Sequence, residues 1–120
     1  MSTKTGKFVK SNRIVKLEDY RQVFKSSCRS VDDTFLVIAK KNDLKRARLG
    51  LAISKKNINK AVSRNNIKRA IRESFRYHKN ILKGIDVVVV VHRKQTTINT
   101  KIINKSLGVH WKNISQCKNF

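Results

Sequence analysis

The feature that most constrains this fold is an amphipathic pattern over residues 61–76, which predicts a long helix. At about 3.6 residues per turn, its apolar face comprises Ile67, Ala70, Ile71, Ser74 and Phe75. The opposite face comprises Asn65, Arg69, Arg72 and Arg76, with Arg64 and Lys68 on the flank. Glu73 is the only acid in the stretch, and it reaches one arginine at a time. The basic face therefore predicts a binding surface for an external polyphosphate.

Two interpretations of this basic face stay open. A run of charge usually forms a solvated outer surface. Against that, arginine outnumbers lysine here, and a guanidinium binds phosphate through two parallel hydrogen bonds, which an ammonium cannot do. The asparagine in the row adds a neutral donor and acceptor that a solubility surface does not need. The pattern favours binding to phosphates.

The charge of the whole chain supports this interpretation. Its 120 residues include 29 lysines and arginines but only 7 acids, which gives a formal net charge of +22 and a pI near 10.8. Such a chain repels itself, and nucleic acid is the first candidate for its partner. The length fits a single RNA-binding domain, residues 1–120, with one modest core. We expect a flexible basic arm over residues 1–13, a globular core over 14–114 and a tail over 115–120.

Cysteine usage and hydropathy indicate the compartment. Cys28 and Cys117 lie far apart and lack metal-ligand spacing, so we expect reduced thiols rather than a disulfide. No window approaches the run of about 18 apolar residues that a membrane-spanning helix needs. The sequence predicts a soluble, cytoplasmic protein without a membrane partner.

The remaining elements follow from shorter patterns. A short helix is expected over residues 17–25, with Leu17, Tyr20, Val23 and Phe24 on one face. Strands are expected over residues 28–31, 34–40, 48–54 and 86–92, and a last helix over residues 99–113. The strand over 86–92 has no polar alternation, so it should be central and covered on both faces. The order predicts an α+β fold, a two-layer α/β sandwich with three helices and a mixed sheet of about four strands.

The strand over residues 48–54 alternates strictly between two faces. Its core face carries Leu49, Leu51 and Ile53, and the other face carries Arg48, Gly50, Ala52 and Ser54. Small side chains on that second face either leave a shallow trough for another backbone or allow a helix to pack closely, and both interpretations are open. Beyond the strand, Asn57 and Asn59 are candidate N-caps for the basic helix.

The sequence offers few groups for catalysis. Asp32 and Asp33 suit a turn better than a metal site, and His78, His92 and His110 are isolated along the chain. No cysteine lies in a nucleophile motif, and no glycine-rich loop resembles a nucleotide cradle. We expect no catalytic residue, no metal site and no tightly bound cofactor. By its chemistry the chain is an RNA or DNA binder.

Three runs of sequence resemble the bacterial ribonuclease P protein component. They are Ser54-Lys55-Lys56, then Ala61-Val62-Ser63-Arg64-Asn65-Asn66-Ile67-Lys68-Arg69, and then Arg72-Glu73-Ser74-Phe75-Arg76. The family signature is Arg-Asn-x-x-Lys-Arg-x-x-Arg-Glu-x-Phe-Arg after a Lys-Lys doublet. The resemblance extends over roughly residues 12–114 and includes Arg48-Leu49-Gly50 and Asp86-Val87-Val88-Val89.

The resemblance implies a subunit of a ribonucleoprotein endonuclease, a hydrolase that removes the 5′ leader of precursor tRNA. In that family the catalytic RNA performs the hydrolysis with bound magnesium ions, and the protein binds substrate and stabilises the RNA. The implied partners are the ribonuclease P RNA and the precursor tRNA leader, with no obligate protein partner. The implied fold joins two parallel strands through the second helix in a left-handed crossover, whereas general rules favour a right-handed one.

Carried over position by position, the resemblance implies two binding surfaces. The surface for the RNA subunit comprises Lys55, Lys56, Arg64, Asn65, Lys68, Arg69, Arg72 and Arg76. The leader-binding cleft, between the first helix and the sheet, comprises Tyr20, Phe24, Leu36, Ile38, Arg48, Ala52 and Ser54. From pattern alone the two aromatic residues belong to the core, and the resemblance moves both toward contact with RNA.

Two other functions fit the composition. One is a structural RNA-binding protein of the ribosomal type with no processing role. The other is a helix-turn-helix DNA binder, which is disfavoured because strands flank the basic helix and no second short helix precedes it.

Overall fold

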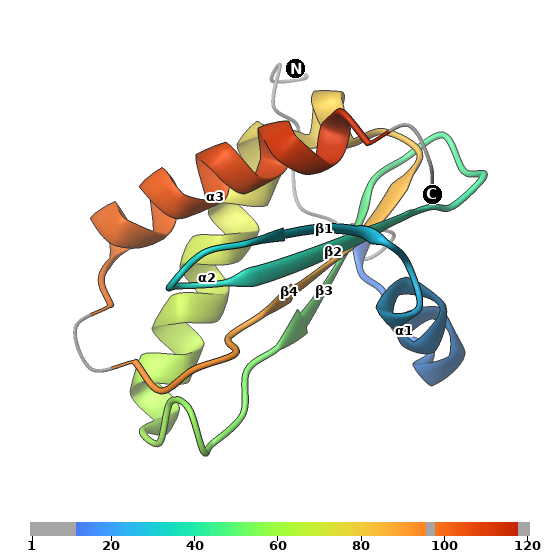
Figure 1. Ribbon diagram of the computed structural model, residues 1–120. Helices are drawn as coiled ribbons and strands as arrows, with labels where there is room; N and C mark the ends of the chain where they lie inside the picture. The colour runs from blue at the N-terminus through green and yellow to red at the C-terminus, as the bar shows by residue number, and fades with distance from the viewer. Residues whose placement is uncertain (1–11, 96–97, 118–120) are drawn as a thin grey trace, which may run out of the picture.

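The computed structural model describes residues 12–95 and 98–117 (Figure 1). The elements in chain order are α1 (Leu17–Phe24), β1 (Cys28–Val31), β2 (Leu36–Lys41), β3 (Arg48–Ala52), α2 (Ala61–Tyr77), the 3-10 helix η2 (Lys79–Leu82), β4 (Ile85–Val90) and α3 (Thr100–Ser115). Within the described residues this is the predicted α+β fold, with three α-helices and a four-stranded mixed sheet. Most of the expected arm over 1–13 and the end of the expected tail lie outside the described residues.

The sheet has the strand order β1-β2-β4-β3. β2 is antiparallel to both β1 and β4, while β3 and β4 are parallel and are joined through α2. β4 is therefore an interior strand, as its unbroken valine run predicts. Val87 and Val89 enter the core on one face and Val88 enters the core on the other, and all three are fully buried.

The larger core lies between the sheet and the pair α2 and α3, which cover the same face (Figure 1). The largest side chains in it include Phe35, Ile71, Phe75, Leu107 and Trp111. Phe75 and Trp111 meet edge to face with their ring centroids 6.0 Å apart. Ser74 lies on the predicted apolar face of α2, where its hydroxyl accepts a hydrogen bond from Trp111 Nε1 at 2.9 Å. The two helices are thus fixed to each other by packing and by one buried polar contact.

A smaller core lies on the opposite face, beneath α1 (Figure 1). It comprises Ile14, Val23, Ile38 and Val88, with Tyr20, Leu36, Ala52 and Val90 packed against it. α1 has only eight residues, so it covers this face incompletely. Leu17 is 64% exposed and Phe24 is 40% exposed, although the spacing predicts both on the buried side of the helix.

The segment before α1 adds a further backbone to the edge of the sheet. Arg13 forms an isolated parallel bridge with Leu49, and Ile14 N donates to Leu49 O at 2.9 Å. Asn12 is buried, and its Nδ2 donates to Ala47 O at 2.8 Å. The fold therefore begins by residue 12, and a short backbone segment borders the outer side of β3.

The N-caps of the two long helices differ. α2 follows Lys60, which makes no side-chain capping bond. The prediction of an asparagine cap for α2 is wrong, because Asn57 Nδ2 instead donates to Val91 O at 2.7 Å and ties the β3–α2 connection to the end of β4. α3 follows Asn99, whose side chain accepts from Ile102 N at 2.9 Å.

The two cysteines form a disulfide with an S–S distance of 1.99 Å. This contradicts the expectation of reduced thiols. Because α3 packs across β1, its C-terminal end brings Cys117 to Cys28 despite a separation of 89 residues. The bond fastens the last helix to the first strand.

A buried polar network joins α3 to the β1–β2 hairpin. His110 Nδ1 lies 2.6 Å from Ser30 Oγ, and His110 Nε2 lies 3.1 Å from Asp32 Oδ2. Asp32 also accepts from Ser106 Oγ and from the backbone N–H groups of residues 34 and 35. Burial raises the pKa of Asp32, but these hydrogen bonds and His110 outweigh it and lower the pKa to about 2. Asp32 thus stabilises the hairpin as a carboxylate.

Candidate nucleic-acid interface

The outer face of α2 carries the central basic residues of the sequence motif. Asn65 and Arg69 are exposed, and Lys68 and Arg72 are half-buried. None of these four side chains has a hydrogen bond or ion pair to another residue of the described part of the chain. Their polar groups are therefore available to an external partner, as the amphipathic pattern predicts.

Arg64 and Arg76, at the two ends of the same face, make contacts within the protein. Arg64 Nη1 donates to Ile58 O at 2.8 Å and to Asn59 O at 3.1 Å, which fixes the connection before α2. Arg76 pairs with Glu73, and its guanidinium lies 4.4 Å from the centroid of the Tyr77 ring. The hydrogen bond between Arg76 and Glu73 lowers the pKa of Glu73 and raises that of Arg76. Glu73 therefore pairs with the arginine at i+3, one of the two partners that its spacing allows.

Lys55 and Lys56 lie in the connection between β3 and α2, and both are exposed. They follow Ser54, which is also exposed. The connection therefore carries positive charge from the end of β3 toward the start of α2.

A hollow of about 380 Å³ lies at the outer edge of β3. It is lined by Arg13, Ile14, Val15, Tyr20, Leu49, Leu51, Lys68 and Arg72. The hollow brings a predicted leader-cleft residue, Tyr20, together with two predicted RNA-subunit residues, Lys68 and Arg72. Burial lowers the pKa of Arg72, and the positive charge of Arg13 lowers it further. Two arginines thus face one hollow, an arrangement that an anion stabilises.

A second hollow of about 570 Å³ continues along the strand. It is lined by Leu51, Ala52, Ile53, Ser54, Asn57, Val90, Val91 and His92. Leu51 borders both hollows, so they follow one another along β3. Ala52 and Ser54, two predicted cleft residues, belong to this second hollow.

The small residues of β3 have different neighbours. A Cβ atom added to Gly50 would lie 2.6 Å from Tyr20 Cε1, so the tyrosine ring packs directly on the glycine. Ala52 and Ser54, further along, border the open hollow. Of the two interpretations of this face, close helix packing therefore holds at Gly50 and an open trough holds beyond it.

The remaining apolar residues predicted for the cleft differ in exposure. Leu36 is half-buried beside Tyr20 and Ala52 on the α1 face of the sheet. Ile38 has no exposed surface, because it lies beneath α1 in the smaller core, and it supports the floor instead of lining it. Phe24 is exposed at the end of α1, where its carbonyl accepts from Arg29 Nη2 at 2.7 Å.

Arg48 is the predicted cleft residue with the most extensive internal contacts. Its Nε and Nη2 donate to the two carboxylate oxygens of Asp86 at 2.7 and 2.6 Å, and Nη1 lies 3.5 Å from Asp19 Oδ2. These contacts raise the pKa of Arg48, and the bond to Asp86 is the main cause. Because Asp86 is buried, the arginine neutralises an acid inside the fold.

Sequence patterns missed several residues that line the hollows, among them Val90, Arg13 and His92. Val90 lies opposite Leu36 in the β2–β4 register and was assigned only to a buried strand. Arg13 belongs to the segment that the sequence predicts as a flexible arm, and His92 is isolated along the chain. The positions of these residues depend on pairing between segments that are distant in sequence. The valine run of β4 also carries no signal of which of its ends is exposed to solvent.

Neither a metal cluster nor a membrane span is found in the part of the chain that the structure describes. Its histidines, cysteines and acids form no group of three or more placed to hold a metal ion. None of its helices is both long enough and apolar enough to cross a membrane.

A basic helix beside a grooved strand edge, on a small α+β scaffold, defines a protein of the RNA-binding class. Comparison with known families is more specific. The family model described as Ribonuclease P matches residues 8–115. The chain belongs to the ribonuclease P protein family.

Individual relatives agree with this assignment. The ribonuclease P protein component of Methylococcus capsulatus is 43% identical over 104 residues, which cover 87% of this chain and 81% of that protein. The component from Legionella pneumophila is 40% identical over 113 residues, which cover 92% of this chain and 95% of that protein. The solved RNase P protein of Staphylococcus aureus matches with a TM-score of 0.77 at 35% identity, over 86% of this chain and 94% of that one. The protein from Thermotoga maritima matches with a TM-score of 0.68 at 30% identity, over 82% and 94%.

Proposed function

We propose that this chain acts as the protein subunit of ribonuclease P by presenting two adjoining RNA-binding surfaces. The outer face of α2 binds the catalytic RNA, and the hollows along β3 bind the 5′ leader of precursor tRNA. Family membership favours this role over that of a structural protein of the ribosomal type.

The observation that supports this proposal most strongly is the hollow that Tyr20 shares with Lys68 and Arg72. An aromatic ring suits an unstacked base, and the two cations suit the phosphates on either side of it. One RNA strand can therefore pass from the α2 face into the trough without crossing an uncharged gap. The hollow beside Ala52 and Ser54 then takes the next nucleotides in extended form.

The protein contributes binding and orientation to the reaction. Guanidinium groups on α2 hold phosphates near the cleavage site, and the trough adds affinity for a precursor that still carries its leader. We assign the hydrolysis itself to magnesium ions held by the RNA component. The protein's part is to supply positive charge beside that centre without competing for the metal ions.

The proposed place of action is the cytoplasm, where low-molecular-weight thiols keep most cysteines reduced. In that compartment the Cys28–Cys117 bond would be open. The bond lies at β1 and the end of α3, and neither cysteine lines the hollows along β3. RNA binding is therefore expected to proceed in either redox state.

Reconstitution tests the proposal. The full chain is mixed with a bacterial ribonuclease P RNA and precursor tRNA at low magnesium, and release of the 5′ leader is followed on a gel. We expect stimulation by the wild-type chain and loss of most of it with Arg69→Ala/Arg72→Ala. The control is Lys83→Ala/Lys112→Ala, which removes two exposed charges elsewhere.

Two outcomes would contradict the proposal. Absence of stimulation, with the chain bound only to ribosomes, would favour the structural role. Equal losses in the two double variants would mean that general charge is sufficient and that the α2 face has no special place.

A further inference from the structure

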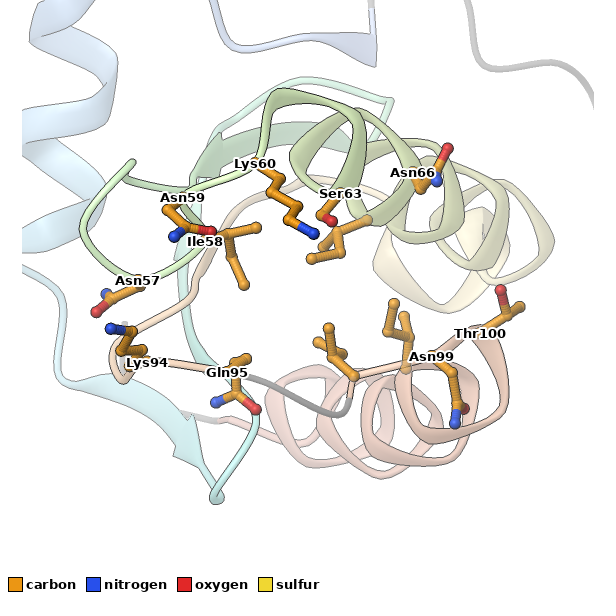
Figure 2. A pocket seen from close by; sticks show the side chains of 13 residues that line it. Asn57, Ile58, Asn59, Lys60, Ser63, Asn66, Lys94, Gln95, Asn99 and Thr100 are labelled. Carbon is orange, nitrogen blue, oxygen red and sulfur yellow. The ribbon is translucent and has the colours of Figure 1, made fainter.

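A third cavity, of about 470 Å³, lies between the first turns of α2 and α3 (Figure 2). The connections before the two helices complete its walls, with residues 57–60 on one side and Lys94, Gln95, Ile98 and Asn99 on the other. It shares only Asn57 with the hollows along β3 and contains none of the predicted RNA-binding residues. It is therefore a separate candidate site.

One part of this cavity is apolar. Ile58, Ile67 and Ile103 are almost fully buried around it, and Ile98 is half-buried at its α3 side. Ile98 therefore presents the apolar surface that a flat ligand can cover, and the three buried isoleucines support it from behind. The volume falls within the range of about 300–1,000 Å³ typical of small-molecule sites.

The α2 side of the cavity is polar and positively charged. Figure 2 shows Asn59, Lys60 and Ser63 directed toward the cavity, whereas Asn66 and Asn99 point away from it. Asn59 provides an amide donor and acceptor, and Ser63 a hydroxyl. Among the described residues no acid lines the cavity, and Lys94 adds a second ammonium at its rim.

The start of α2 is unusual in its own electrostatics. A lysine occupies the N-cap, no side chain caps the first turn, and the first turn contains no acid. The positive end of a helix dipole favours an anion, so a lysine there is unfavourable for the isolated chain. A bound phosphate would reverse this, because it would accept from the first-turn N–H groups and pair with Lys60.

We propose that this cavity binds one unstacked nucleotide of an RNA strand. Its phosphate lies at Lys60 and the first turn of α2, its base covers Ile98, and Asn59 hydrogen-bonds the base edge. An aliphatic wall opposite a cationic polar wall matches the two halves of a nucleotide, and single-stranded RNA presents such splayed bases. The inference rests on the proposed function only in taking RNA as the source of the nucleotide.

The test is an NMR titration of the full chain with three probes. AMP and ribose 5-phosphate carry the same phosphate but differ by the base, and the trinucleotide AAA adds flanking phosphates. We expect AMP to shift the first-turn amide signals of α2 and the methyl signals of Ile98 and Ile103. Its dissociation constant should be at least about five-fold lower than that of ribose 5-phosphate, because the base adds contact. The trinucleotide should bind more tightly than AMP.

Variants assign these effects to the two walls. Lys60→Ala should weaken binding of all three probes, because it removes a phosphate contact. Asn59→Leu and Ile98→Ala should weaken AMP but leave ribose 5-phosphate unchanged. The matched controls are Lys83→Ala and Asn80→Leu, at exposed positions outside the lining of the cavity. Asn59 is exposed, so its variant tests the base contact even if Ile98→Ala lowers the melting temperature.

Three results would overturn the inference. Equal affinities for AMP and ribose 5-phosphate would mean that the site binds only an anion at a helix N-terminus and does not recognise the base. Tighter binding of AMP than of the trinucleotide would indicate a free nucleotide as the ligand. Absence of shifts at the cavity would mean that no site exists. Arg69→Ala/Arg72→Ala should leave AMP binding intact, so failure of this inference and failure of the proposed function are distinguishable.

Discussion

The salt dependence of RNA binding is the most direct measure of the α2 surface. Six cations of the predicted surface have no acidic partner among the described residues, whereas Arg76 pairs with Glu73: Lys55, Lys56, Arg64, Lys68, Arg69 and Arg72. Neutralising about six phosphates gives a slope of log affinity against log salt of about −4 to −5. Affinity for the catalytic RNA should then fall about 250- to 1,000-fold between about 50 and 200 mM salt.

Removing two of these cations reduces the slope by a defined amount. Arg69→Ala/Arg72→Ala leaves about four phosphate contacts, which corresponds to a slope of about −3. The affinity of this variant should therefore fall only about 60-fold over the same range of salt concentration. Neither side chain has a hydrogen bond or ion pair to another described residue, so the substitutions remove charge without breaking an internal bond. The stability of the free chain should be nearly unchanged.

Fluorescence anisotropy with labelled ribonuclease P RNA, at constant magnesium and varied monovalent salt, measures both slopes. Lys83→Ala/Lys112→Ala serves as the charge-matched control and should keep the wild-type slope. A wild-type slope of about −1 would refute phosphate binding by the α2 surface, since so few released counterions cannot come from a row of phosphate contacts. The same slope in both double variants would show that the location of the charge is unimportant.

Four further predictions concern the scaffold. Gly50→Ala should push the Tyr20 ring away, lower stability by about 1–3 kcal/mol and weaken leader binding. A Cβ atom at Gly108 would meet nothing within 4 Å, so Gly108→Ala should raise stability by about 1 kcal/mol in thermal melts. The Asp32 carboxylate should contribute about 1–2 kcal/mol to the free energy of unfolding above pH 4, allowing for its partial exposure. Because its folded pKa lies below its unfolded pKa, this contribution should vanish as pH falls from about 4 to about 2. Urea titrations of wild type and Asp32→Asn should therefore converge at the low end of this range. Under oxidising conditions, Cys28→Ser should lower the free energy of unfolding by about 4–5 kcal/mol, because the disulfide closes a loop of 89 residues. The RNA dissociation constant should stay unchanged, and a weaker RNA affinity would contradict this prediction.

Local patterns were sufficient for the elements and for the basic face. α2 spans Ala61–Tyr77 as its periodicity predicts, and β4 is central because an unbroken valine run needs cover on both faces. In both cases neighbouring residues carry the signal. The exposure of Asn65 and Arg69 then follows from the side on which the apolar residues lie.

Patterns failed where the partner of a side chain is distant in sequence. Arg48 lies opposite Asp86 in the parallel β3–β4 register and neutralises this buried acid, a pairing that no local pattern predicts. Asn57 satisfies a carbonyl at the end of β4 in place of capping α2. The disulfide likewise depends on the path of α3 across β1. None of these partners can be chosen before the strand order is known.

The distribution of the acids explains why the α2 surface needs RNA. Five of the seven acids pair with cations other than Lys68, Arg69 and Arg72: Glu18 with Arg21, Asp19 and Asp86 with Arg48, Asp33 with Arg93, and Glu73 with Arg76. Of the other two, Asp32 holds the hairpin to α3, and Asp43 occupies a turn at positive φ.

No acid is therefore left to balance Lys68, Arg69 and Arg72. The unbalanced face follows from how few acids the chain has and from the cations with which most of them pair. Repulsion among these cations is reduced most when several phosphates bind at once, because each phosphate then lies between two positive groups. A polyanion such as folded RNA meets that requirement, whereas single small anions would have to bind separately, each at its own entropic cost.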